Sequence, residues 1–327
     1  MQVMQKPKFM RGPIITGQTA GLQKFFHDFT LYKKHFALVM MFVPVIAYYV
    51  VFKYLPMAGI QIAFKDYKIR DGIWGSAWVG LKHFRDAFAA PFFRRALINS
   101  IVISLKKTVF GFPMPIILAL MLNEVRHVKF KRVTQTISYL PHFLSWVILA
   151  GLFTNILSPN TGMLNYILVN WFGFAKGIHF LGQASTFQPT LVVTEIWKSV
   201  GWGSIIYIAT ISGIDPQLYE AAVCDGASRW QRMTHITLPS LMPTITIMLI
   251  LNLGGILEAG FDQIFNLYNA AVYSTGDIID TYVYRLGLGE MKYSFTAAVG
   301  LFKNVVGFIL VMGTNAITKR INDTGIW

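Results

Sequence analysis

Long apolar runs alternate with short polar segments along the whole chain, and this pattern predicts helices that cross a membrane. A helix needs roughly 20 consecutive, mainly apolar residues to span the hydrocarbon layer, and each run is close to that length. The predicted spans lie at about residues 36–55, 98–122, 133–153, 190–211, 241–261 and 295–317. We therefore predict an all-α membrane protein with six transmembrane helices and both termini on one side.

The polar segments divide the chain into three predicted regions. Residues 1–35 are expected to form a cytoplasmic N-terminal arm, and residues 318–327 a cytoplasmic C-terminal tail. Residues 36–317 form the six-helix domain, with an external loop at 56–97 and a cytoplasmic loop at 212–240. The external loop contains Gly and Trp and apolar stretches too short to span, so we expect a structured cap there and not a linker.

Composition agrees with a bilayer location. The 327 residues are 54% hydrophobic and 13% charged, with a mean hydropathy of +0.50, which excludes a soluble domain of this size. The formal net charge of +14 is spread among apolar segments and forms no basic stripe on a polar domain. We therefore expect a lipid bilayer and no nucleic acid as the environment of the chain.

The distribution of Lys and Arg predicts the orientation. Segments 1–35, 123–132, 212–240 and 318–327 together contain 14 Lys and Arg, against three in the second and third segments on the opposite side. Cytoplasmic loops carry an excess of Lys and Arg, so these four segments are placed inside the cell. The exception is the first external loop, which contains Lys65, Lys68, Arg70, Lys82, Arg85, Arg94 and Arg95.

Residues 212–240 have the most distinctive local pattern. Asp215 is placed to cap a short helix that begins at Pro216, where the missing N–H costs nothing. The helix carries one apolar stripe, and Gly226 then permits the backbone to turn. The pattern predicts a second short helix from about Ser228, which leads the chain into the next apolar run.

The spacing inside this loop resembles a known family signature. Glu-Ala-Ala, three residues, Gly, nine residues and Ile-x-Leu-Pro match the cytoplasmic loop of the membrane subunits of binding-protein-dependent ABC importers. The matching residues are Glu220, Ala221, Ala222, Asp225, Gly226, Ala227, Ile236, Leu238 and Pro239, while Met233 stands where sugar permeases often have Phe. The resemblance implies a coupling helix that sits in a groove of a separate ATPase subunit. An ordinary amphipathic loop between membrane helices is the alternative.

Other stretches of the chain resemble one branch of that family. The runs at 54–67 and 79–84, together with Asn99 and Ser100, are similar to polysaccharide or aldouronate permeases of the carbohydrate importers. This resemblance implies a six-helix core and import of an oligosaccharide by alternating access. The basic external loop makes the chain similar to permeases of alginate importers, so we expect an acidic, uronate-like solute. A neutral oligosaccharide is the alternative.

The resemblance also implies the other parts of the transporter. We expect a second homologous permease, two ATP-binding subunits and an extracytoplasmic solute-binding protein, assembled in the bacterial cytoplasmic (inner) membrane. The chain has no Gly-rich loop ending in Gly-Lys-Ser/Thr, so ATP and Mg²⁺ are expected on the ATPase subunits. We interpret this chain as a non-catalytic permease subunit with no cofactor or metal of its own.

Polar and aromatic side chains inside the spans mark a candidate solute path. In the fourth predicted span Glu195, Lys198 and Trp202 share a helix face, with Trp197 about a quarter-turn away. An aromatic ring beside hydrogen-bonding groups is the surface that binds sugars. The alternative is that Glu195 and Lys198 only neutralise each other.

Two further spans repeat this idea. Tyr139, His142 and Trp146 fall on one stripe of the third span, where helix packing and an internal hydrogen bond of His142 are the alternatives. In the fifth span a small and polar face carries candidate solute contacts, for which close helix packing is the alternative. These fifth-span candidates are Asn252, Glu258 and Asp262, with Gly255 and Ala259 between them.

The predicted spans contain more basic than acidic side chains. Lys106 and Lys107 in the second span and Lys303 in the sixth have no obvious acid nearby in the sequence. Because a charge in the membrane needs a partner or a watery cavity, we expect Lys303 to line a path that favours an anionic solute. Snorkelling, contact with lipid phosphate and pairing with acids of a second permease are the alternatives.

Two other functional classes are weaker interpretations of the same sequence. A secondary transporter should show paired broken helices in corresponding halves, and the sequence indicates none. An intramembrane enzyme should show a metal-binding pattern such as His-Glu-x-x-His, or a Ser or Asp catalytic pair, and the spans contain neither. Neither class accounts for the loop around Glu220.

Overall fold

The computed structural model describes residues 36–322. The predicted arm at 1–35 and the last residues of the predicted tail, 323–327, lie outside the described residues. The chain divides into two compact units, with the boundary along the chain between Ile60 and Gln61. Within the described residues the structure is almost entirely helical, with one short two-stranded sheet.

Of the first unit, the structure describes one continuous helical run. It consists of α2 (Phe36–Tyr49), a π-helical turn (Val50–Tyr54) and the start of a 3₁₀ segment (Leu55–Phe64), which extends into the second unit. Residues 40–64 are long and apolar enough to cross a membrane, and none of the most apolar stretch is buried. Such a surface requires lipid or another protein around it.

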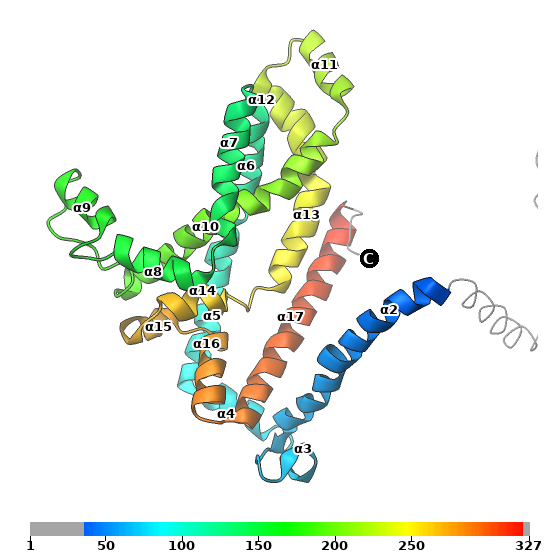
Figure 1. Ribbon diagram of the computed structural model, residues 1–327, viewed down its shortest axis with the longest axis vertical. Helices are drawn as coiled ribbons and strands as arrows, with labels where there is room; N and C mark the ends of the chain where they lie inside the picture. Colours follow the sequence, from blue (N-terminus) through cyan, green and yellow to red (C-terminus); the bar gives the residue numbers. More distant parts are fainter. Residues whose placement is uncertain (1–35, 323–327) are drawn as a thin grey trace, which may run out of the picture. The chain divides into compact units, whose positions relative to one another are not determined.

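The second unit is built from long helices (Figure 1). They are α5 (Pro91–Gly111), α6 (Pro113–Glu124), α7 (Val128–Tyr139), α8 (Trp146–Ile156), α10 (Ala184–Ser212), α13 (Leu238–Gly254) and α17 (Tyr293–Asn322). Shorter helices are α3 (Gly72–Gly75), α4 (Lys82–Ala89), α9 (Met163–Asn170), α11 (Pro216–Cys224), α12 (Arg229–Arg232), α14 (Phe261–Leu267), α15 (Tyr273–Gly276) and α16 (Ile279–Tyr284).

Short irregular helices and one hairpin complete this unit. The 3₁₀ segments are Leu140–Phe143 and Ala270–Val272, and the π-helical segments are Met233–Thr237 and Arg285–Gly289. Strands β1 (Lys65–Asp66) and β2 (Ala77–Trp78) pair antiparallel, with Lys65 opposite Trp78. Residues 56–97, predicted to form a structured external cap, contain this hairpin together with α3 and α4.

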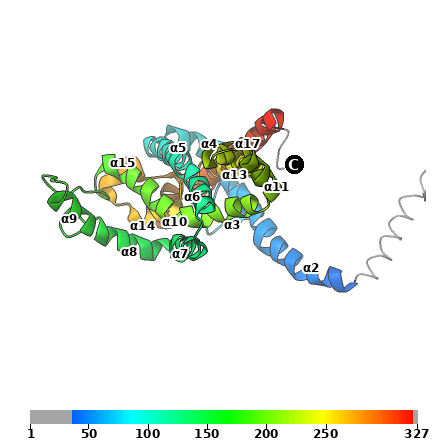
Figure 2. The same ribbon diagram turned by 90° about the horizontal axis from the view of Figure 1, so that it is seen from above.

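Helix α10 is the centre of the second unit because α5, α6, α7 and α13 all pack against it. A Cβ on Gly201 would lie 2.0 Å from the carbonyl oxygen of Ser138, so only glycine lets α10 and α7 approach this closely. Buried apolar side chains form clusters around Phe187, Phe93 and Leu241. Seen from above, α8 and α9 extend to the side opposite α13 and α17 (Figure 2).

Most of the predicted spans correspond to helices in the structure. Among the described residues four helices are long and apolar enough to cross a membrane, at Met40–Phe64, Pro91–Glu124, Arg229–Gly254 and Tyr293–Ala316. They contain all or most of the predicted first, second, fifth and sixth spans. The fourth predicted span lies within the 29-residue helix α10, whose Glu195 and Lys198 lower its hydropathy. The fold is therefore compatible with six crossings.

Two predictions about these helices are wrong in detail. The third span is not one straight helix, because Val128–Phe143 and Trp146–Ile156 are bent by 104° at a break after Phe143. The fifth ends at Gly254 and not near residue 261. Residues 255–260 are turns, and Ala259 has a φ of +47°, a left-handed conformation that is costly for alanine.

The bend in the third span is held by a lysine from α10. The Nζ atom of Lys198 donates hydrogen bonds to the carbonyl oxygens of His142, at 3.2 Å, and Leu144, at 2.6 Å. It also lies 5.4 Å from the centre of the Trp146 ring. Where a helix breaks, its carbonyls lose their intrahelical partners, and Lys198 supplies them with a charged donor. The suggested pairing of Lys198 with Glu195 is not present.

We predict that Lys198→Met lowers the stability of the purified protein. The two carbonyl oxygens would lose their donor, at a cost of about 1–3 kcal/mol, which lowers Tm by several degrees. Thermal unfolding in detergent measures the effect. The matched control is Lys176→Met, because that side chain is exposed. Equal Tm values for the two variants would contradict this role of Lys198.

Candidate solute cavity and coupling loop

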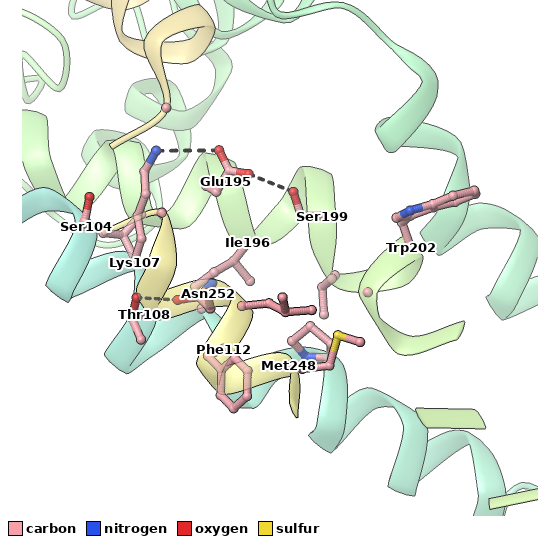
Figure 3. A pocket seen from close by; sticks show the side chains of 18 of the residues that line it. Ser104, Lys107, Thr108, Phe112, Glu195, Ile196, Ser199, Trp202, Met248 and Asn252 are labelled. Carbon is pink, nitrogen blue, oxygen red and sulfur yellow. Dashed lines mark hydrogen bonds and ion pairs between the residues drawn. The ribbon is translucent and has the colours of Figure 1, made fainter. Parts of the chain in front are cut away.

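A cavity of about 1000 Å³ lies between α5, α10, α13 and the turns that follow α13 (Figure 3). Most of its lining is apolar, with a few polar side chains on one side. The apolar lining includes Phe112, Pro115, Val192, Ile196, Val200, Ile205, Ile206, Met248, Leu251 and Ile256. A mainly apolar cavity with a few placed polar groups is typical of a ligand site.

Lys107 connects three walls of this cavity. Its Nζ atom lies 3.6 Å from the carboxylate of Glu195 on α10 and donates a 2.8 Å hydrogen bond to the carbonyl oxygen of Ala259. It also donates to the side-chain oxygen of Gln263 on α14. Ser199 donates to Glu195 at 2.8 Å, which completes the polar side of the cavity. The side chain of Lys107 is only 14% exposed, so these partners replace water around its charge.

Two further polar groups of the cavity differ in their partners. Thr108 donates a 2.7 Å hydrogen bond to the Asn252 side chain, which joins α5 to α13 (Figure 3). Glu258 is exposed and forms no ion pair with any other residue in the described part of the chain. Its carboxylate is therefore free to accept hydrogen bonds from a bound molecule.

A second cavity, of about 610 Å³, adjoins the first. Both cavities are lined by Glu258 and Gly260, so the turns after α13 separate them. The second is bounded by α14, α16 and α17, and its main charged contact is the 2.6 Å ion pair of Lys303 with Asp280. Lys303 is therefore not a free cation facing a solute.

The expectation that the lysines lack local acids is wrong for Lys303 and Lys107, whereas the partner of Lys106 is a neutral side chain. Lys303 pairs with Asp280 and Lys107 with Glu195, and Lys106 donates a 2.7 Å hydrogen bond to the side chain of Gln188. In each case the partner comes from an element distant in sequence. Among the described residues that line the two cavities, acidic side chains outnumber basic ones.

The predicted path residues fall into several groups in the structure. Those lining the first cavity are Glu195, Trp202, Asn252 and Glu258. Lys303 lines the second cavity, and Trp197 lines an apolar pocket of about 400 Å³ between α8, α9 and α10. Those lining none of these three spaces are Tyr139, His142, Trp146, Lys198 and Asp262.

Several of the predicted aromatic contacts are made within the protein. The His142 ring stacks on the ring of Trp202, with centroids 4.6 Å apart and planes 1° from parallel. Trp197 meets Phe153 edge to face at 5.5 Å. Trp146 packs against the cluster around Phe187. The packing alternative therefore accounts for His142 and Trp146, while Trp202 also borders the first cavity.

The fifth predicted span contributes to the cavity by a different geometry than expected. The prediction placed Asn252, Gly255, Ala259 and Asp262 on one face of a continuous helix, with Glu258 adjacent. Because α13 ends at Gly254, that shared face does not exist. The turns nevertheless bring Gly255, Glu258 and Ala259 to the cavity, whereas Asp262 lies outside its lining, in the first turn of α14.

The sequence interpretation used Lys107 as one of the lysines that suggested a path for an anionic solute, but it did not identify Gln263 as a partner of Lys107 or Asp280 as the partner of Lys303. Lys107 is visible in the sequence as a charge within a span, but Gln263 and Asp280 lie in a segment predicted to be external. Only the tertiary fold brings Gln263 to Lys107 on α5 and Asp280 to Lys303 on α17. No group of three or more His, Cys, Asp or Glu within residues 36–322 is arranged to hold a metal ion.

The loop at 212–240 has the predicted structure. Asp215 accepts a 2.9 Å hydrogen bond from the backbone N–H of Gln217, and α11 begins at Pro216. Gly226 has a φ of +78°, where glycine has no steric cost. Ser228 then forms a capping box at the start of α12. Figure 1 shows α11 at one extremity of the second unit, beyond α6, α7 and α12.

Helix α11 leaves an apolar surface without a partner in the described chain. None of its residues is buried, and Leu218 and Val223 are exposed. Its tie to the following segment is a 2.9 Å hydrogen bond between the hydroxyls of Tyr219 and Thr237. Glu220, which begins the Glu-Ala-Ala motif, is also exposed. A short, well-capped helix with exposed apolar side chains is suited to docking on another protein.

Comparison with known proteins reveals close relatives over nearly the whole chain. Protein LplB of Bacillus subtilis is 44% identical over 290 residues, which cover 89% of this chain and 91% of the relative. The polygalacturonan/rhamnogalacturonan transport system permease protein YteP of the same organism is 46% identical, with coverage of 89% and 90%.

A solved structure shows the same fold. A chain of the bacterial alginate ABC transporter, in complex with an alginate pentasaccharide-bound periplasmic protein, superimposes with a TM-score of 0.84. It is 43% identical, and the match covers 91% of this chain and 99% of that one.

The family match agrees with the loop and the fold. Residues 111–323 match the model of the binding-protein-dependent transport system inner membrane component family, and this region contains the Glu-Ala-Ala loop and most of the cavity lining. The apolar helices fit the same assignment. The chain therefore belongs to the inner membrane components of binding-protein-dependent transport systems, and it is a transport permease.

Proposed function

We propose that this chain is a permease subunit of an ATP-driven importer that passes an acidic oligosaccharide into the cytosol by alternating access. The main support is its identity of 46% to a polygalacturonan/rhamnogalacturonan permease and of 43% to a chain of the transporter for alginate, an acidic polysaccharide. Both similarities extend over about nine-tenths of the chain. Galacturonans and alginate share a carboxylate on their sugar rings.

The cavity supports sugar binding but does not by itself favour an anion. Glu195, Glu258 and Asn252 offer acceptors for hydroxyl groups, and Trp202 offers an aromatic edge to the same space. The lysines that suggested an anionic solute already have partners within the chain. The surplus of acidic side chains favours a neutral oligosaccharide as the second candidate. An acidic solute would need donors from elsewhere in the transporter.

The rest of the transporter follows from the same proposal. ATP and Mg²⁺ would bind two ATPase subunits, a second homologous permease would complete the path, and an extracytoplasmic binding protein would deliver the solute. The exposed face of α11, which includes Leu218 and Val223, would dock on an ATPase subunit. The loop at 212–240 and both termini would lie in the cytosol, as the distribution of Lys and Arg indicates.

Reconstituted complexes in proteoliposomes test the solute. We predict that oligouronates are taken up and stimulate ATP hydrolysis, whereas neutral oligosaccharides of equal length give roughly a tenth of that stimulation or less. A tenfold ratio corresponds to a free-energy difference of about 1.4 kcal/mol. The matched control is the same chain length with its carboxylates reduced to alcohols. Stimulation by neutral sugars alone would contradict the acidic solute and leave the importer in place.

The turn after α11 provides a test of coupling. We predict that Gly226→Pro abolishes solute-stimulated ATP hydrolysis, because proline cannot adopt the positive φ and the orientation of α11 changes. Gly226→Asn is the matched control, since asparagine tolerates this conformation and a Cβ there meets nothing within 4 Å. Membrane insertion of both variants is checked by fluorescence of a fused reporter. Normal coupling in Gly226→Pro would contradict the role of the loop.

A further inference from the structure

The hairpin of the first external loop presents two tryptophans to its surroundings. Trp74 is 79% exposed and Trp78 63% exposed, although both rings contact the side chain of Lys65. The Nζ atom of Lys65 donates a 2.8 Å hydrogen bond to the carbonyl oxygen of Ile73 and lies 6.0 and 5.0 Å from the centres of the two rings. Lys65 itself is 3% exposed. The buried ammonium group of Lys65 therefore positions the two rings, and both rings remain exposed on their outer faces.

Basic side chains, and two acidic ones, are exposed in the same segment. Lys68, Arg70 and Lys82 are exposed, and none of them forms an ion pair with another described residue. Ile69 and Leu81 are exposed beside them. The exposed side chains of residues 65–82 therefore include indole rings, aliphatic groups, the cations of Lys68, Arg70 and Lys82, and the carboxylates of Asp66 and Asp71, so the cations are in slight excess.

The hairpin lies at the level where helices capable of spanning the membrane begin. The backbone N–H of Tyr67 donates a 2.8 Å hydrogen bond to Ser294, in the first turn of α17, and the rings of Tyr67 and Tyr293 meet at 6.0 Å. Helix α4, which follows the hairpin, packs on α17 and leads directly into α5 (Figure 1). Along the chain, the hairpin also begins where the apolar stretch at 40–64 ends.

We propose that residues 65–82 form a membrane-surface site that binds anionic phospholipid headgroups of the outer leaflet. Trp74 and Trp78 would lie in the interfacial layer, where indole rings are enriched because one edge is polar and the body is apolar. Lys68, Arg70 and Lys82 would bind the phosphate groups. This assignment goes beyond the transport function and does not depend on the identity of the solute.

Headgroups fit this surface better than a sugar or a protein ligand. Residues 65–82 line none of the three cavities described above. The apolar stretch at 40–64 ends where strand β1 begins at Lys65, so chain connectivity puts the hairpin next to a segment that can cross a membrane. Lipid binding also accounts for an external loop rich in Lys and Arg, which the usual charge distribution does not explain.

Fluorescence quenching in nanodiscs tests the site in the assembled transporter. Cys224, the only cysteine of the chain, is replaced by Ser, the other subunits are made cysteine-free, and Trp74→Cys carries an environment-sensitive dye. We expect quenching by lipids brominated near the headgroup end of the acyl chains. The quenching should increase about twofold or more when phosphatidylglycerol replaces part of the phosphatidylcholine.

Charge variants separate headgroup binding from mere proximity to lipid. In Lys68→Gln/Arg70→Gln/Lys82→Gln the dependence on phosphatidylglycerol should disappear, whereas the exposed Lys176→Gln, the matched control, should retain it. The proposal is overturned if the dye is not quenched in either lipid. It is also overturned if the triple variant keeps the full lipid dependence, or if only an acidic oligosaccharide or the binding protein changes the signal.

Discussion

The cavity of this permease depends on one buried ammonium group. Lys107 reaches from α5 to a carboxylate on α10, to the carbonyl oxygen of Ala259 in the turns after α13, and to Gln263 on α14. A charge within a membrane domain is costly unless it is fully partnered, so these walls must stay together while Lys107 stays charged. The left-handed Ala259 is maintained by the same contact. Opening the cavity at this point requires these bonds to be exchanged.

The charged groups of the interior are mainly committed to holding the structure. Lys198 satisfies the carbonyls at the bend between α7 and α8, and Lys303 joins α17 to α16 through Asp280. Glu258 is the exception, since it lines both cavities without an ion pair to another described residue. At the far end of the unit, α11 is held by few contacts and exposes apolar side chains. The cavity lining and the outer face of α11 are therefore built from different kinds of surface.

Much of the fold was predictable because it depends on local pattern. The length of the apolar runs located four spans and also α10, although α10 carries charged residues. The cap at Asp215 and the positive φ at Gly226 were predictable from residue type alone. The failures have a common cause. The bend after Phe143 and the turns that follow α13 are held by Lys198 and Lys107, which lie on other helices. A window of sequence contains no information about such partners.

The candidate site also has a part that was predictable from local sequence and a part that depends on tertiary packing. Spacing, capping and turn chemistry act between near neighbours, so the sequence alone was enough to predict a membrane permease with a capped helix beginning at Pro216. It also pointed to Glu195, Trp202, Asn252 and Glu258, which line the cavity. Which charges are free depends on the tertiary structure. Lys107 and Lys303 find their partners 88 and 23 residues away, and pairing across that separation is set by how the helices pack.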